Sequence, residues 1–197
     1  MLQVREIVNS IFTSKTYILY HEGEDKAWLV DIGDIEPVVS FCEEKRLTGE
    51  GVFLTHGHFD HIYGLPALVV HFPNCKVYTT EYGKQSLASD KLNMSKYHER
   101  PIRYDGDNVI LVHEGENMTL FDDECKLVYY ETPGHNPGCL TMVIGDLIFT
   151  GDAYIPGIGT TTVVPHANKE QAQQSLDRIL KLAEGKTILS GHKTKEL

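Results

Sequence analysis

Three histidines and an aspartate lie within six residues in the first third of the chain. The segment THGHFDHIYG at 55–64 contains His56, His58, Asp60 and His61. Neutral imidazoles and carboxylates are the ligands that zinc and its first-row neighbours prefer. A single histidine is far more often a surface or core residue with an ordinary hydrogen bond, but this density reverses that expectation. The segment therefore predicts a metal site.

The flanking residues predict where this site lies in the fold. The apolar run 51–54 is typical of a short buried strand, and the run 62–70 can supply one face of a helix. In an extended segment His56 and His58 point the same way, because the side chains of a strand alternate between its two faces. We expect Asp60 and His61 to turn into the first helical turn and to face the same space, at the rim of a sheet.

Three later segments share one pattern, in which a strand ends and a metal-binding residue follows in a glycine-containing turn. They are TPGHNPG at 132–138, TGDAY at 150–154 and SGH at 190–192, which contribute His135, Asp152 and His192. Glycine lets the backbone turn tightly and come close to an ion. Each segment alone is a weak signal, but together with the histidine motif they form a strong set.

Length and composition describe an ordinary globular domain. The 197 residues fit one domain over 1–197, with 41% hydrophobic and 23% charged residues. The formal net charge of −10 argues against a protein that mainly binds nucleic acid or an anionic membrane. We find neither a signal peptide nor a stretch long enough to cross a membrane. We therefore expect a cytoplasmic protein with a small-molecule substrate, and composition leaves its oligomeric state open.

The four cysteines are scattered along the chain without a CxxC pair. This spacing favours reduced thiols over a disulfide framework. Cys139 is of separate interest because it directly follows the TPGHNPG segment. Asp31, at the end of an apolar strand, is either a turn former or a buried carboxylate that supports the metal ligands.

Hydrophobic periodicity predicts two β-rich parts joined by alternating helices and strands. Strands are expected at 2–8, 16–20, 27–31, 76–80, 118–120, 126–131, 139–144, 147–150 and 187–189. One helix is expected at 81–89. Another is expected to begin after Asp34, its predicted N-cap, and to end at about Arg46. A further helix is predicted at 168–183, with one apolar face formed by Ala172, Leu176, Ile179, Leu180 and Ala183. This order fits an α/β fold, a four-layered αββα sandwich.

Two irregular segments are the predicted sources of substrate contacts. Residues 90–107 are polar, and a segment of this length inside a compact domain is often functional. Arg100 and Arg103 in this segment are predicted to contact an anionic substrate. Tyr154 and His166, which follow Asp152, are predicted to line the same pocket.

The motifs resemble those of the metallo-β-lactamase fold superfamily of metallohydrolases, over essentially the whole chain. VDIG at 30–33, HGHFDH at 56–61, PGHNPG at 133–138, GDA at 151–153 and GH at 191–192 stand in the order of that family. The resemblance implies the αββα sandwich and two divalent ions, with zinc as the first expectation and iron or manganese as alternatives. His56, His58 and His135 would hold one ion, Asp60, His61 and His192 the other, and Asp152 would bridge them.

Within this superfamily the sequence resembles the glyoxalase II-like (hydroxyacylglutathione hydrolase-like) subgroup. That subgroup has the Asp60–His61 pair and the bridging aspartate, which true β-lactamases lack. His58, in place of an acid, is unlike the diiron flavoprotein branch. We expect the helical C-terminal domain of glyoxalase II to be absent, because the sequence ends five residues after His192.

Three departures from the family pattern leave the metal ligands intact and argue against glutathione thioesters as the substrate. Cys139 stands where serine is usual, and residues 159–162 read GTTT where an arginine-aspartate pair is common. Lys193-Thr194 replaces glycine-proline after the last ligand.

The implied chemistry is hydrolysis of a thioester or related ester. Two divalent ions that share a water would lower its pKa toward neutrality and hold a bridging hydroxide facing the carbonyl carbon. The ions would also stabilise the oxyanion. Asp60 would bind its ion and orient the hydroxide, which makes it the predicted catalytic residue.

Other functions stay open at this point. One is an oxidoreductase that resembles persulfide dioxygenases, with one iron held by His56, His58 and either Asp152 or His135. The complete second set of ligands argues against it. A lactonase or phosphodiesterase of the same fold is a further alternative. A non-catalytic module that keeps metal for stability is disfavoured, because a structural site needs only four ligands.

Overall fold

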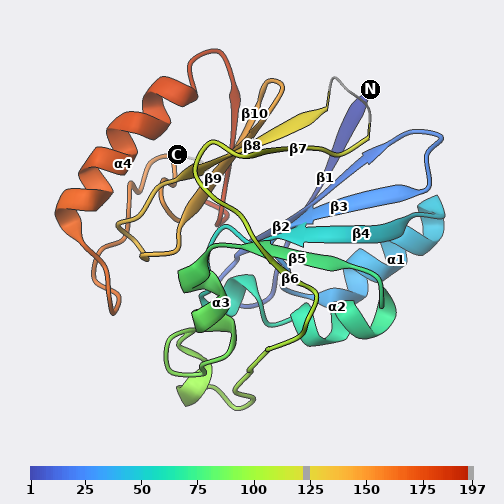
Figure 1. Cartoon of the computed structure of the whole chain (residues 1–197), viewed down its shortest axis with the longest axis horizontal. Helices are drawn as coiled ribbons and strands as arrows, with labels where there is room; N and C mark the ends of the chain where they lie inside the picture. Colours follow the sequence, from blue (N-terminus) through green and yellow to red (C-terminus); the bar gives the residue numbers. More distant parts are fainter. Residues whose placement is uncertain (122–124, 195–197) are drawn as a thin grey trace.

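A computed structural model describes residues 1–121 and 125–194 and contains two β-sheets that pack face to face, with helices on both outer sides (Figure 1). The strand order is β1-β2-β3-β4-β5-β6 in the first sheet and β11-β10-β9-β8-β7 in the second. The predicted αββα sandwich is confirmed. None of the helices in the described ranges is long and apolar enough to cross a membrane.

The first sheet places several strand ends at one edge. It consists of β1 (Leu2–Val8), β2 (Lys15–His21), β3 (Lys26–Val30), β4 (Thr48–Phe53), β5 (Lys76–Thr79) and β6 (Val109–Leu111). β1 to β3 are antiparallel, and β3 to β6 are parallel. Parallel neighbours need crossover connections, which contain α1 (Ile35–Lys45), α2 (Leu65–His71) and α3 (Glu81–Leu87), and the short 3₁₀ turns η1 (Phe59–His61) and η2 (Ser95–Tyr97). The carboxyl ends of β3, β4 and β5 therefore meet at the same edge.

The second sheet brings its own loops to that edge. It consists of β7 (Asn117–Thr119), β8 (Lys126–Glu131), β9 (Leu140–Ile144), β10 (Leu147–Gly151) and β11 (Thr187–Ser190). Its strands are antiparallel except for the pair β10 and β11, which α4 (Lys169–Leu182) connects on the outer side. The two sheets are tied together where Leu140 N–H donates to Thr55 O at 2.7 Å.

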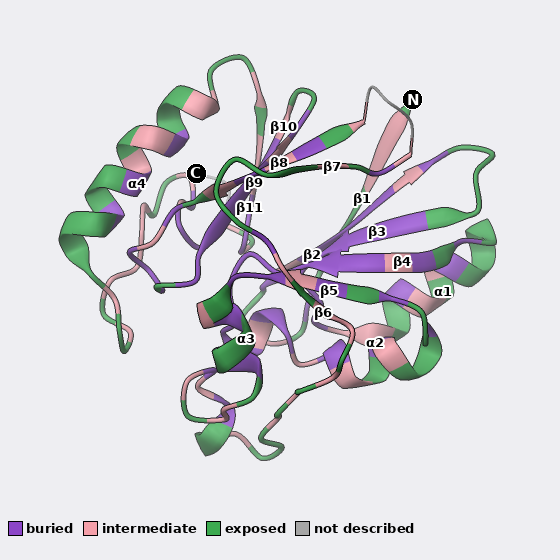
Figure 2. Cartoon of the chain, viewed as in Figure 1, coloured by how far each residue is buried: buried purple, intermediate pink, exposed green. Residues whose placement is uncertain are grey.

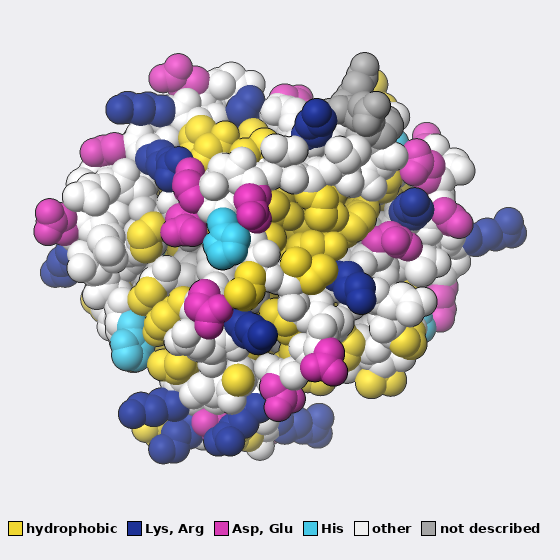
Figure 3. Space-filling model, in the orientation of Figure 1, with side chains coloured by type: hydrophobic (Ala, Val, Ile, Leu, Met, Phe, Trp, Pro, Cys, Tyr) yellow, Lys and Arg dark blue, Asp and Glu magenta, His cyan; other side chains and the backbone are white. Residues whose placement is uncertain are grey.

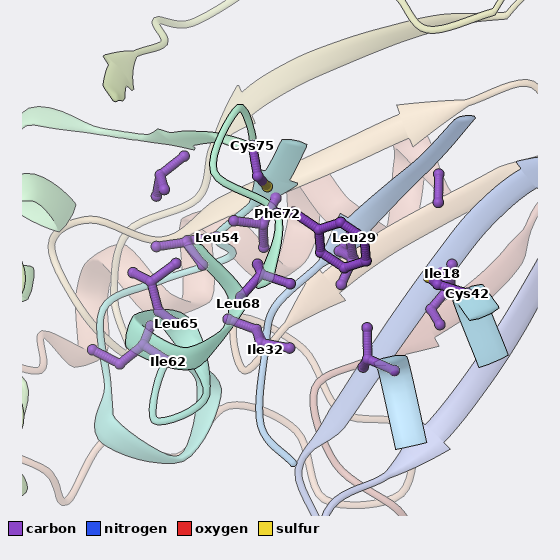
Figure 4. Packing of buried hydrophobic residues seen from close by; sticks show 14 of the residues in the cluster. Ile18, Leu29, Ile32, Cys42, Leu54, Ile62, Leu65, Leu68, Phe72 and Cys75 are labelled. Atoms are coloured by element: carbon purple, nitrogen blue, oxygen red, sulfur yellow. The ribbon is translucent and has the colours of Figure 1, made fainter. Parts of the chain in front are cut away.

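Three clusters of buried apolar side chains explain the layers, and the third, around Ile148 and Ile179, lies between the second sheet and α4. In β2, Ile18 faces the cluster under α1 and α2, while its neighbour Leu19 faces the second sheet. Because both faces of the central strands are covered, these strands are apolar nearly throughout, and Figure 2 shows them as buried. Leu65 and Leu68 of α2 pack onto the sheet beside Leu54 (Figure 4).

The predicted elements are present, with ends shifted by up to three residues, but two features of the helices differ from the expectation. Asp34 is the N-cap residue of α1, as predicted, but its side chain makes no capping hydrogen bond, because its carboxylate accepts hydrogen bonds from Ser10 and Tyr63. On α4, Leu180 is 47% exposed, whereas Ser175 is buried in the face that packs on the sheet. Periodicity could not identify Ser175, because its burial depends on a hydrogen bond to Pro133 O at 2.6 Å.

Candidate metal centre

The seven predicted ligands come from both sheets and converge at the shared edge. Four of them follow β4 in the turn around η1, and the others follow β8, β10 and β11. Their ligand atoms form three overlapping groups, within each of which all atoms lie within 4.8 Å of one another: His56, His58 and His135; His56, His61 and Asp152; Asp60, His61 and His192.

A buried aspartate fixes the start of the histidine turn. Asp31 follows β3 and has a positive φ of 55°, a conformation that costs free energy in a residue other than glycine. Its carboxylate accepts hydrogen bonds from Thr55 N–H and from the Thr55 hydroxyl, each at 2.7 Å. Asp31 is thus both a turn residue and a buried supporting carboxylate, the two alternatives that its position in the sequence left open.

Hydrogen bonds on the outer ring nitrogens orient two of the histidines. His61 Nδ1 lies 2.8 Å from Asp31 Oδ2, and His135 Nδ1 lies 2.8 Å from Thr161 O. Both partners are acceptors, so each Nδ1 carries the proton and donates it. The Nε2 atoms then face the centre, an arrangement typical of metal-binding histidines.

His192 follows the same pattern and His58 reverses it. His192 Nδ1 donates to Phe12 O at 2.8 Å, which leaves Nε2 facing the centre. For His58 the outer atom is Nε2, which lies 3.1 Å from Asn136 Nδ2. Asn136 is itself held, because its Oδ1 accepts from Gly138 N–H at 2.8 Å. His58 therefore presents Nδ1 to the centre.

Asp152 faces both halves of the site. Its Oδ1 lies 3.5 Å from His61 Nε2, while its Oδ2 lies 3.2 Å from His192 Nε2 and 3.6 Å from His135 Nε2. The approach of Gly191 is so close that a Cβ there would lie 2.2 Å from Asp152 Oδ1. Gly191 is therefore required because no side chain would fit beside Asp152, and not only because the chain turns there.

The residues present fit a divalent cation. Among the described residues, His56 Nε2 and Asp152 Oδ1 are buried without a hydrogen-bond partner. A buried polar atom without a partner costs about 1–3 kcal/mol, and both atoms belong to the group that also contains His61. Imidazole nitrogens and carboxylate oxygens suit zinc, iron or manganese.

The electrostatics of the site also favour a cation. Burial lowers the pKa of His56, and it lowers the pKa of His58 to about 3, so both are neutral and able to bind metal at pH 7. Burial opposes protonation of His192 as well, but hydrogen bonds to Asp152 and Asp60 outweigh it and raise that pKa to about 10. The carboxylates therefore stabilise positive charge at the position where an ion would sit.

An open cavity of about 380 Å³ lies over the ligands. Its floor contains ligand side chains, among them Asp60 and Asp152. Its walls are formed by Phe12, Met94, Ile155, Ile158, Val164 and Lys193.

The four predicted substrate contacts do not line this cavity. Arg103 is paired with Asp90 at 3.1 Å with its side chain 67% exposed, and Arg100 is exposed. Lys and Arg side chains gather at the lower edge of the face in Figure 3, where Figure 1 places the segment after α3. Tyr154 packs against the cluster around Ile148, and His166 is exposed. Their role in substrate binding stays a prediction.

Cys139, the cysteine beside the His135 motif, is a packing residue. It is buried in the cluster that includes Ile148 and Ile179, on the side of the second sheet that α4 covers. Burial raises the pKa of its thiol well above the ordinary value. It is therefore a protonated apolar side chain at neutral pH.

Sequence reasoning missed the residues that surround the ligands. Asn136 lay inside a quoted motif, and Lys193 was visible as a departure from the family pattern. Met94 lies in the segment 90–107 that the sequence favoured, although it was not singled out there. Phe12 carries no such signal, because it reaches the cavity through a turn far from the motifs in sequence. Phe12 and Met94 both have a positive φ, 52° and 67°.

Comparison with known proteins identifies the family. The family model described as "Metallo-beta-lactamase superfamily" matches residues 16–192, a range that includes every ligand of the centre. The chain belongs to the metallo-beta-lactamase superfamily. This superfamily assignment agrees with the resemblance noted from the motifs.

Several curated relatives are named hydroxyacylglutathione hydrolase. Hydroxyacylglutathione hydrolase of Enterobacter sp. (strain 638) is 29% identical over 87% of this chain and 59% of its own length. The protein of the same name from Cronobacter sakazakii is 28% identical over 94% of this chain and 65% of its own. The chain thus spans about three fifths of the length of these relatives.

Solved structures of the superfamily share the fold over nearly the whole chain. The crystal structure of BLEG-1 B3 metallo-beta-lactamase superposes with a TM-score of 0.86 at 26% identity. The superposition covers 98% of this chain and 92% of the BLEG-1 chain.

Proposed function

We propose that this superfamily member is a metal-dependent hydrolase that cleaves a thioester or related ester of a small molecule. The observation that carries the proposal is the position of Asp152, whose carboxylate lies within 3.6 Å of His135 from one ligand set and of His61 and His192 from the other. A single structural ion would not need donors from two groups joined in this way. The name of the curated relatives supports a thioester as the substrate class.

We assign the ligands to two ions. His56, His58 and His135 would hold one ion, and Asp60, His61 and His192 the other, with Asp152 shared between them. When bound, divalent ions supply Lewis acidity, which polarises an ester carbonyl and acidifies water. Zinc is the first candidate, because the donor set consists of imidazoles and carboxylates in a compact site.

The protein residues keep this chemistry ordered. The outer hydrogen bonds of the four orienting partners (Asp31, Thr161, Phe12 and Asn136) hold the rings before substrate arrives. Asp60 forms part of the cavity floor and lies 3.2 Å from His192 Nε2. We propose it as the catalytic residue, because a carboxylate there can accept a hydrogen bond from attacking water and so orient it.

A substrate panel on metal-loaded protein tests the proposal. S-lactoylglutathione, simple acyl thioesters, an acyl lactone, a β-lactam and a phosphodiester would be compared by kcat/KM, with metal-free protein as the control. We expect metal-dependent turnover of at least one thioester or ester, at least tenfold faster than of the phosphodiester. Preferred turnover of the phosphodiester would show that the proposal is wrong.

A separate assay tests the oxidoreductase alternative. His56, His58 and His135 form a complete group for one ion, as a mononuclear iron enzyme requires. Oxygen consumption by iron-loaded protein with glutathione persulfide, in the absence of thioester hydrolysis, would favour this function over the hydrolase.

A further inference from the structure

The wall of the cavity over the metal centre is apolar. Phe12 and Ile158 line it although they remain 66% and 63% exposed, and Met94, Ile155 and Val164 continue the same surface. Single exposed apolar side chains are common and need no explanation. Several of them around one cavity mark a surface that an apolar group of a ligand would cover favourably.

One fixed positive charge lies on the rim of this cavity. Among the described lining residues, Lys193 is the one lysine or arginine. Its side chain forms no ion pair within residues 1–121 and 125–194. The nearby carboxylates, Asp60 and Asp152, are ligands that already contact histidines. Lys193 is therefore the lining cation that is free to pair with an anionic ligand.

The backbone holds Lys193 and Phe12 next to each other. Lys193 N–H donates to Thr13 O at 2.9 Å, and His192 Nδ1 donates to Phe12 O at 2.8 Å. A β-bridge between Ser14 and His192 also joins the turn before β2 to the segment after β11. The charge and the apolar ring are thus parts of one preformed rim.

We propose that Lys193 and Phe12 are the specificity-determining residues of the hydrolase, an inference that rests on the function proposed above. Lys193 pairs with one carboxylate of the substrate, and Phe12 covers an apolar acyl group. The substrate class is a small thioester with an aliphatic or aromatic acyl group and one carboxylate on its thiol part. The cavity of about 380 Å³ accommodates one such molecule.

Matched thioesters test the role of Lys193. S-hexanoyl-3-mercaptopropionate carries a carboxylate, and S-hexanoyl-2-mercaptoethanol is its neutral counterpart. In the metal-loaded wild type we expect kcat/KM to be about fivefold higher for the carboxylate, as one partly exposed ion pair allows. The ratio of kcat/KM for the carboxylate thioester to kcat/KM for the neutral thioester should fall to about one in Lys193→Gln and persist in Lys193→Arg.

The acyl pocket is tested with a shorter substrate. The preference for S-hexanoyl over S-acetyl-3-mercaptopropionate should fall about threefold in Phe12→Ser, because less apolar surface is covered. This variant keeps the backbone carbonyl that binds His192, so its metal content, measured by elemental analysis, should equal that of the wild type.

Two controls locate the effect. Lys181→Gln removes the same charge from the exposed side of α4 and should keep the wild-type ratio. Arg100→Ala/Arg103→Ala tests the segment at 90–107, which the sequence favoured. An unchanged ratio in Lys193→Gln, or loss of the ratio in the double arginine variant, would overturn the proposal.

A binding measurement separates this inference from the proposed reaction. The thioether 3-(hexylthio)propionate cannot be hydrolysed, and its Kd for metal-loaded protein can be measured by calorimetry. We expect Kd to rise about fivefold in Lys193→Gln, and equal Kd values would overturn the role of Lys193. If no thioester is cleaved but this Kd depends on Lys193, the hydrolase proposal fails and the binding site stands.

Discussion

At the scale of single residues, the centre depends on partners that hold each imidazole from behind. His61, His135 and His192 donate from Nδ1 to oxygen acceptors, whereas His58 has Asn136 on its Nε2. Such outer hydrogen bonds typically change metal affinity by 10- to 100-fold when they are removed. The ligand motif alone therefore does not determine how tightly the site binds.

Asn136→Ala should weaken metal binding by about fivefold, less than where a ring donates to an acceptor, because the His58 ring loses the amide N–H contact that orients it. Chelator competition on the purified protein measures this affinity, and nitrogen-15 NMR of the imidazoles reports whether His58 still presents Nδ1. Asn117→Ala, on the exposed part of β7, is the control. An affinity equal to that of the wild type would show that Asn136 is only a packing residue.

Asp34 makes stability depend on pH. Burial alone would raise its pKa, but hydrogen bonds from Tyr63 and Ser10 outweigh burial and hold the pKa below the ordinary value. A lowered carboxyl pKa contributes stability that is present above the unfolded pKa of about 3.9 and is lost as pH falls through the folded pKa. Asp34→Asn should therefore lower the free energy of unfolding at pH 7 by about 1 kcal/mol, a value reduced for partial exposure.

Urea unfolding at pH 7 and at about pH 3 checks this prediction, because the difference between Asp34→Asn and the wild type should shrink at the lower pH. Glu44→Gln on the exposed side of α1 should stay within about 0.5 kcal/mol of the wild type at both values. A difference that is the same at pH 7 and pH 3 would mean that the Asp34 charge is not the cause.

At the scale of elements, α4 holds the loop that carries His135. Asn168 N–H donates to Gly134 O at 2.7 Å, and the Ser175 hydroxyl donates to Pro133 O at 2.6 Å. A Cβ on Gly134 would lie 2.3 Å from Ala172 Cα, so helix and loop are in direct contact. The helix on the outer side of the second sheet thus fixes one ligand of the centre.

Ser175→Ala should lower the free energy of unfolding by about 1–3 kcal/mol, because Pro133 O loses its donor in a partly buried position. It should also weaken metal binding, since the His135 loop becomes less ordered. Gln174→Ala, one residue earlier and exposed, should change neither quantity. Thermal unfolding and chelator competition measure the two effects, and a stable variant with unaltered metal affinity would contradict the link between helix and loop.

The elements and the ligands could be predicted from the sequence because their signals are local. The histidine motif concentrates its ligands within six residues, and apolar periodicity marks the strands directly. The side chain of Asp34 and the exposure of Leu180 could not be predicted, because both depend on contacts with distant segments. The same holds for Phe12, whose place at the cavity follows from a hydrogen bond to His192, 180 positions away.

At the scale of the whole molecule, the centre joins the two sheets. The turn after β4 belongs to the first sheet, and the loops with His135, Asp152 and His192 belong to the second. Each of the three groups of ligand atoms combines residues of the turn after β4 with His135, Asp152 or His192, and therefore joins the two sheets. Bound ions would therefore crosslink the two halves of the sandwich.

Metal removal should lower the Tm of the protein. A ligand at a hundred times its Kd stabilises the folded state by about 2.7 kcal/mol, and about 1 kcal/mol corresponds to 2–4 °C in a domain of this size. We expect dialysis against a chelator to lower Tm by about 5–10 °C and added zinc to restore it. Asp152→Ala should show a smaller shift, and a Tm that does not respond to metal in the wild type would contradict the crosslink.

The number of bound ions tests the assignment of the centre most directly. Elemental analysis of wild-type protein purified with ample metal should give two ions per chain, because each of the two proposed ligand sets is complete and Asp152 lies beside His135 of one and His192 of the other. Asp152→Ala should bind both ions more weakly while it remains folded. One ion per wild-type chain at full metal supply would contradict the dinuclear centre.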